Sequence, residues 1–185
     1  MVLLMAVIGT SASAQSADKL YEEGKKLYDA KNYTAAFPKL KAAAEKGHKK
    51  AQYRMGRCYD KGHAVEENDK TAFEWYLKSA KQGFAKAQYQ VGKSYKNGEG
   101  IGKDRKVAVE WFMKAAKQDN ADAQLALGKA YLKGKGIAAD EAKAKSWLKR
   151  AVNHEDDGKQ ILKELREEAA AGDVDAVNIL KLVGK

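Results

Sequence analysis

Several residue types are scarce in this chain of 185 residues, and each scarcity excludes a class of protein. A single cysteine, Cys58, cannot form an internal disulfide, which excludes a disulfide-stapled scaffold. The three histidines, His48, His63 and His154, stand at no spacing typical of metal ligands, and no pair of carboxylates stands out as a catalytic pair. An apolar run at the N-terminus is too short to span a bilayer.

That N-terminal run has the pattern of an export signal. Eight or nine apolar residues are followed by small residues ending in Ala12-Ser13-Ala14, which is typical of a signal-peptidase site. No Lys or Arg precedes the run, so either the start lies upstream of Met1 or the amino terminus supplies the charge. The competing interpretation is a buried N-terminal helix. We predict a cleaved signal peptide over residues 1–14 and a periplasmic or secreted protein of a Gram-negative bacterium, and no lipoprotein cysteine follows the site.

The most informative feature is a segment that recurs at an interval of 36 residues. The residues that mark the interval are Gln52, Gln88 and Gln124; Gly56, Gly92 and Gly128; Tyr59, Tyr95 and Tyr131; Trp75, Trp111 and Trp147. A fixed period of this length is typical of stacked-repeat proteins, in which no single unit can bury its apolar face alone. The repeat therefore predicts an all-α solenoid built from helix hairpins and favours a binding scaffold over an enzyme.

Within each unit, local signals predict two helices and a glycine-containing loop. Asn68, Asp104 and Asp140 occupy the position of a helix N-cap before each second helix. The small repeat glycines are expected to let the two helices of a hairpin approach closely. An earlier hairpin is predicted over residues 15–47, with a loop four residues shorter, a helix over 18–29, and Pro38 near the first turn of its second helix.

The repeated unit reads Ala-x-x-x-Leu/Met/Val-Gly-x-x-Tyr-x-x-Gly-x-Gly-Val/Ile, then Asp-x-x-Lys-Ala-x-x-Trp-x-x-Lys-Ala-Ala-x-x-Gly. This pattern resembles the Sel-one-like repeat (SLR) family over residues 48–153, as units 48–83, 84–119 and 120–153, while residues 15–47 look like a tetratricopeptide variant. The resemblance implies a right-handed α/α superhelix of about four hairpins that serves as a protein-binding scaffold. Ala64 departs from the pattern, because it replaces the second loop glycine.

After Asn153 the repeat pattern weakens, and residues 154–185 are predicted to form capping helices, the last resembling a truncated first helix. A cysteine-rich branch of the family has been linked to β-lactam binding, but this chain lacks the paired cysteines. Cys58 is expected to be small, buried and structural, and His63 to be a solvated loop residue. No catalytic residue, metal or cofactor is predicted.

The candidate site lies on the first helix of each unit, which lines the concave face in tetratricopeptide-type hairpins. The residue three before the repeat glycine is aromatic in three units, and the residue one after it is basic in all four. These positions differ by four, so they share a helix face. The predicted partner-binding residues are Tyr21, Lys25, Tyr28, Tyr53, Arg57, Tyr89, Lys93, Lys96, Lys129 and Lys133. The alternative is that the tyrosines are core residues and the lysines only aid solubility.

Charge indicates what kind of partner such a face would bind. The chain carries a net charge of +10, while residues 154–185 hold 5 Lys and Arg against 8 Asp and Glu, so the basic excess belongs to the repeats. We predict a monomeric adaptor that binds an acidic protein or peptide, with an anionic membrane surface second and nucleic acid disfavoured for lack of a motif. Alternative functions are a cell-wall (peptidoglycan or β-lactam) binding or modifying protein and an immunity protein against a secreted effector.

Overall fold

The computed structural model describes the backbone of residues 3–185 and the side chains of residues 16–185. This part of the chain is all-α, as predicted, and none of its helices is long and apolar enough to cross a membrane. The helices are α1 (Leu3–Asp29), α2 (Tyr33–Glu45), α3 (Lys49–Asp60), α4 (Asp69–Lys81), α5 (Ala85–Asn97), α6 (Arg105–Ala116), α7 (Ala121–Lys133), α8 (Glu141–Val152), α9 (Gly158–Ala170) and α10 (Val174–Val183).

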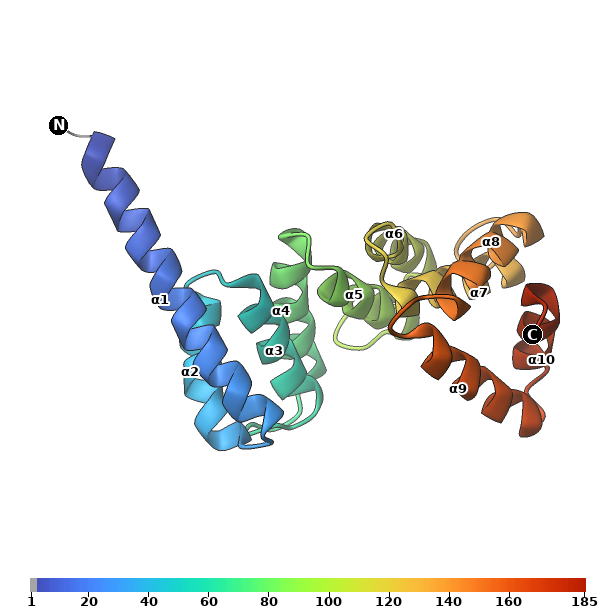
Figure 1. The fold of residues 1–185 in the computed structure, drawn as a ribbon, viewed down its shortest axis with the longest axis horizontal. Coiled ribbons are helices and arrows are strands. Elements are labelled where there is room, and N and C mark those ends of the chain that lie inside the picture. Colours follow the sequence, from blue (N-terminus) through green and yellow to red (C-terminus); the bar gives the residue numbers. More distant parts are fainter. Residues whose placement is uncertain (1–2) are drawn as a thin grey trace. The chain divides into compact units, whose positions relative to one another are not determined.

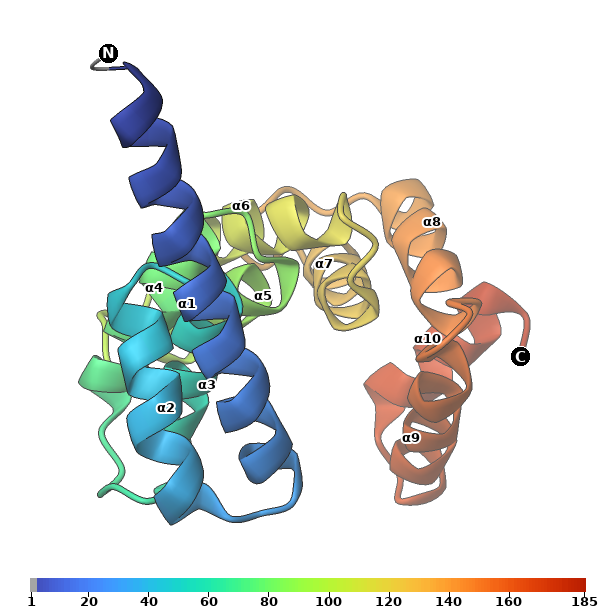
Figure 2. The same cartoon turned by 60° about the vertical axis from the view of Figure 1, so that its left-hand side comes forward.

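Consecutive helices pair as antiparallel hairpins in two compact units, Met1–Gly102 and Lys103–Lys185. In the first unit α1 packs on α2 and α3 on α4, and α5 follows against α4 (Figure 1). In the second unit α6 packs on α7, α7 pairs with α8, and α9 and α10 lie side by side as a last hairpin that contacts α8 (Figure 2). Helix α1 begins at Leu3, well before the expected Asp18. The signal-peptide prediction rests on residues 1–14, whose side chains lie outside the described part.

The helix starts follow the predicted capping chemistry. Asn68 Oδ1 accepts a hydrogen bond from the Thr71 backbone N–H at 2.8 Å, and Asp140 Oδ1 accepts one from Lys143 at 2.9 Å. Asp104 caps α6 in the same way, so all three predicted caps are confirmed. An N-cap contributes about 1 kcal/mol by satisfying an otherwise unpaired N–H group. Pro38 differs from its expected place, because it lies inside α2 rather than in the first turn.

The repeat glycines mark the places where the two helices of a hairpin touch. A Cβ atom added to Gly24 would lie 2.9 Å from Leu40 Cγ, and one added to Gly128 would lie 2.6 Å from Leu148 Cγ. At Gly56 the added atom would overlap the ring of Tyr76. Gly24 and Leu40 are four residues closer in sequence than the other pairs, which confirms the shorter loop of the first hairpin.

The repeat tryptophans lie at the edge of the core rather than inside it. Trp75, Trp111 and Trp147 are all half-buried. The cationic side chain three residues later lies over each indole ring. The distance to the ring centroid is 4.2 Å for Lys78 Nζ over Trp75, 4.3 Å for Lys114 Nζ over Trp111 and 4.9 Å for Arg150 Cζ over Trp147. A cation over an indole face is worth about 0.5–1 kcal/mol at such sites.

The last two helices lie beyond the last full repeat. Asp173 Oδ1 accepts a hydrogen bond from the Ala176 backbone N–H at 2.9 Å, as Asn120 Oδ1 does from Ala123 at 2.8 Å at the start of α7. Helix α10 therefore begins like the first helix of a unit, and with 10 residues against the 13 of α7 it is shorter, as the sequence pattern predicted.

Candidate functional site

The first-helix face differs in burial between the hairpins. In α1, Tyr21 and Tyr28 are each only 6% exposed, so they belong to the core, as the alternative interpretation proposed. Tyr21 stacks on His48 with ring centroids 4.2 Å apart, and the Tyr28 hydroxyl hydrogen-bonds His63 Nδ1 at 2.9 Å. Burial leaves these two tyrosines little surface for a partner, and the first half-buried tyrosine of the face is on α3.

His63 is not the solvated loop residue that its variable position suggested. Its ring stacks on Tyr33 at 3.8 Å with the two planes 6° apart, and it is half-buried. His48 is the N-cap of α3, where its Nδ1 accepts from the Ala51 backbone N–H at 3.1 Å and its Nε2 lies 3.2 Å from Asp18 Oδ1. Both histidines therefore pack α1 and α2 against the next hairpin, and His48 uses Nδ1 as an acceptor, which requires that nitrogen to be unprotonated.

Lowering the pH from 7 to 5 is expected to destabilise the first unit. Burial lowers the pKa of His48 and of His63 below the ordinary value, so the unfolded chain binds these protons first as the pH falls. Their contribution is complete above the unfolded pKa and is lost as the pH falls through the folded one. Urea unfolding of the wild type and of His48→Asn, which keeps a cap without a titrating ring, measures this. The variant should lose less stability over the interval; an equal loss would contradict the assignment to His48.

On α3, the predicted face contains Arg57 beside a tyrosine hydroxyl group. Arg57 is half-buried, and its Nε is buried without a hydrogen-bond partner. Burial alone would lower the pKa of Arg57, but the hydrogen bond with Tyr53 and the neighbouring Tyr28 and Tyr76 outweigh it and the pKa is raised. Among the described residues no carboxylate forms an ion pair with Arg57. The guanidinium is thus held in place and charged, with its ion-pairing capacity unused.

Tyr53 completes this part of the face as a half-buried aromatic. Its ring lies 5.3 Å from Phe84 in an edge-to-face contact and 5.7 Å from Tyr76. The Tyr76 hydroxyl donates to Asp60 Oδ2 at 3.2 Å, and burial raises the pKa of Tyr76. Tyr53 is therefore fixed by rings on two sides, which limits the entropy lost when a partner packs on it.

One repeat later, α5 carries the same pattern. Tyr89 and Lys93 are half-buried and Lys96 is exposed. Within residues 16–185 no ion pair or hydrogen bond engages the Lys93 side chain. In α1 the equivalent residue, Lys25, is already paired with Asp29 at 3.3 Å. The first unit thus holds two basic groups of the predicted set, Arg57 and Lys93, without a carboxylate partner among the described residues.

In the second unit the predicted basic residues are already engaged. Lys129 Nζ lies 3.7 Å from Glu168 Oε2 of α9, and Lys133 pairs with Asp175 of α10. The hydrogen bond from Lys133 lowers the pKa of Asp175. The acidic C-terminal segment is therefore not independent of the basic face, because it supplies the carboxylates that neutralise it. Sequence reasoning noticed the opposite charges of the two segments but missed that they pair.

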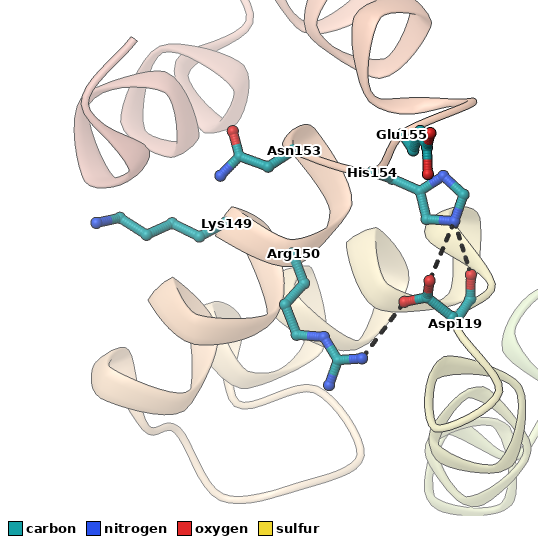
Figure 3. Close-up of a pocket in the computed structure, with 6 residues that line it drawn as sticks. All are labelled: Asp119, Lys149, Arg150, Asn153, His154 and Glu155. Carbon is teal, nitrogen blue, oxygen red and sulfur yellow. Dashed lines mark hydrogen bonds and ion pairs between the residues drawn. The ribbon is translucent and has the colours of Figure 1, made fainter.

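The pocket of Figure 3 lies in the second unit, where the end of α8 contacts the segment that precedes α7. It has a volume of about 370 Å³ and is lined by Asp119, Lys149, Arg150, Asn153, His154 and Glu155. His154 Nε2 bonds the Asp119 backbone oxygen at 2.9 Å while its Nδ1 accepts from the Asp157 backbone N–H at 3.2 Å. In the figure, Lys149 and Asn153 point away from this pairing. Gln82 makes the equivalent bond to Gly47 O at 2.9 Å in the first unit, so the joint is a repeated structural contact.

The remaining features of the described residues are the thiol, the metal-ligand types and a second pocket. Cys58 is 1% exposed, as expected, and burial raises the pKa of its thiol to about 11, which keeps it protonated and unreactive at neutral pH. Within residues 16–185 no group of His, Cys, Asp and Glu side chains could hold a metal ion. A second pocket, of about 550 Å³, has Leu132 and Leu182 in its lining and the Lys133–Asp175 ion pair at its rim.

Comparison with known proteins agrees with this architecture. The Sel1 repeat model matches residues 49–84, 85–120 and 121–156. A Sel1 repeat protein from Oxalobacter formigenes is 35% identical, with a TM-score of 0.70 over 84% of this chain and 72% of that one. A protective antigen of uropathogenic Escherichia coli with an SLR fold is 26% identical, with a TM-score of 0.75 over 97% of this chain but only 40% of its own length.

A more distant structure shares the fold alone. Helicobacter pylori cysteine-rich protein B is 22% identical, with a TM-score of 0.53 over 66% of this chain and 93% of its own. None of the curated protein sequences matches this chain. The matched repeats begin one residue after the predicted units and keep the same interval.

Proposed function

The chain belongs to the Sel1 repeat family, and on this premise we propose that it is an exported adaptor that binds an acidic protein through the face formed by Tyr53, Arg57, Tyr89 and Lys93. Proteins of this family are protein-interaction scaffolds, which is consistent with a protein that is not an enzyme. The observation that carries the proposal is the pair of basic groups, Arg57 and Lys93, without carboxylate partners among the described residues. Interaction hot spots are enriched in tyrosine and arginine, and this face combines half-buried tyrosines with an arginine.

The envelope location rests on the export-signal pattern of residues 1–14. In that setting the partner is an envelope or extracellular protein with an acidic surface. The net charge of +10 raises the rate of encounter with such a surface, and this attraction is screened by salt.

A charge-reversal pull-down tests the proposal. Immobilised wild-type protein is exposed to periplasmic extract, alongside Arg57→Glu/Lys93→Glu and the control Lys70→Glu/Lys81→Glu, which makes the same charge change at exposed positions on α4. We expect the first variant to retain about a tenth or less of the captured protein, because two attractive contacts become repulsive. The control should retain most of it, and capture by the wild type should fall with salt. Equal capture by both variants would remove the proposed face from consideration.

A further inference from the structure

In the second unit, carboxylates of the chain itself already pair with the predicted basic residues. Lys129 occupies the position after a repeat glycine, which we call the basic repeat position and which also holds Lys25, Arg57 and Lys93. Its partner, Glu168, projects from the last turns of helix α9, and Asp175 meets Lys133 from the first turn of α10. Carboxylates on an acidic helix hairpin thus reach this face of a repeat.

The four basic repeat positions divide into two kinds. Lys25 and Lys129 have carboxylate partners within the chain, whereas Arg57 and Lys93, on α3 and α5 of the first unit, have none among the described residues. A difference in exposure does not explain this division, because all four side chains are half-buried. What separates them is whether an acidic side chain of this protein reaches them.

From this division we infer that Arg57 and Lys93 form a two-point site for carboxylates presented by a helix of the partner protein, and that α9–α10 closes the equivalent position in the second unit to that partner. The inference rests on the proposed function and narrows it in two respects. It assigns the partner's binding element as a helix with acidic residues on one face, and it confines the site to the first unit.

The surroundings of Arg57 favour a protruding carboxylate over a continuous anionic surface. Arg57 is half-buried, its guanidinium hydrogen-bonds Tyr53, and its Nε is covered. A carboxylate at the end of a side chain on a helix can reach a guanidinium that is recessed in this way. The apolar side of the same helix can pack on the Tyr53 ring. A lipid or nucleic-acid phosphate surface would instead engage the exposed lysines, which also occur on second helices, such as Lys70 and Lys81 on α4.

Fluorescence anisotropy with defined peptides tests the inference on the full chain. The probe is a labelled alanine-based 20-residue helix with glutamates on one face, and its twin carries glutamines at the same positions. The wild type is expected to bind the glutamate peptide at least about tenfold more tightly than the twin. Arg57→Gln/Lys93→Gln should bind it about tenfold more weakly than the wild type. Lys129→Gln/Lys133→Gln should stay within about twofold, because those lysines are already paired.

Two further variants separate the possible outcomes. Glu168→Gln/Asp175→Asn frees the two lysines, so it should bind the glutamate helix more tightly or at a second equivalent. A glutamate peptide with a central proline, which cannot form the helix, should bind more weakly. Thermal unfolding checks that each variant remains folded.

The inference fails if the glutamate helix does not bind, if Arg57→Gln/Lys93→Gln has no effect, or if the proline peptide binds equally well. It also fails if phosphatidylglycerol vesicles or duplex DNA bind the wild type in an Arg57-dependent way while the peptide does not. If the pull-down depends on Arg57 and Lys93 but the peptide fails, the proposed function survives and the helical partner does not. If the pull-down shows no such dependence, both are wrong.

Discussion

Gly100→Ala is expected to destabilise the first unit by about 3 kcal/mol. Gly100 has φ 69°, and a Cβ atom on it would overlap the backbone carbonyl of Asp69, at the start of α4. A backbone group held in a helix cannot turn aside as a flexible side chain can. Gly136 repeats the arrangement against Arg105 O with φ 82°, so Gly136→Ala should have the same effect on the second unit.

Two matched variants separate conformational strain from overlap. Gly47 has φ 87° and no atom within 4 Å of an added Cβ, so Gly47→Ala should cost only about 1 kcal/mol. Ala64 already has φ 65° at the position of the missing loop glycine, so Ala64→Gly should stabilise by a few tenths to 1 kcal/mol. Urea unfolding followed by circular dichroism measures all four. If Gly100→Ala costs no more than Gly47→Ala, the overlap with Asp69 is unimportant.

Gly56→Ala is expected to cost about 2–3 kcal/mol by separating α3 from α4. The added Cβ would enter the ring of Tyr76, which is 3% exposed and cannot move without losing its hydrogen bond to Asp60. The shift would also disturb Arg57, one residue further along α3, so binding through the proposed face should weaken together with stability.

A double-mutant cycle with Tyr76→Leu tests whether the ring is the cause. Removing the aromatic ring makes room for the added methyl group, so the double variant should be less destabilised than the sum of the two single variants. Additive losses, measured by urea unfolding, would assign the cost of Gly56→Ala to a different contact.

Much of the architecture could be predicted because it repeats. Three occurrences of one pattern identified the helices, the caps at Asn68, Asp104 and Asp140, and the glycines at the helix crossings. The position of Arg57 and Lys93 on first helices also followed from the interval. Each of these depends on contacts within a hairpin, where sequence spacing determines which side chains meet.

Other properties depend on residues that occur once. Tyr21 has the spacing of Tyr53 and Tyr28 lies two turns further along the same helix, yet both are buried, because Tyr21 stacks on His48 and Tyr28 bonds His63 of the following hairpin. Nothing in the interval predicts that Glu168 reaches Lys129, since α9 and α10 lie beyond the last full repeat. The signal in the sequence is Asp173-x-Asp175-Ala176, which resembles Asn120-x-Asp122-Ala123 and indicates that α10 begins like a first helix.

The joints between hairpins also determine how the protein would respond to a pulling force. Tyr28 meets His63, Gln82 meets Gly47 and His154 meets Asp119, each across 35 residues, so these bonds tie a hairpin to its neighbour alone. A load applied to the two ends of such a chain is carried by the joints in series, and the weakest joint opens first. Extension would then proceed in steps of about one hairpin, and a partner bound across α3 and α5 would act as a clamp on the segment it covers.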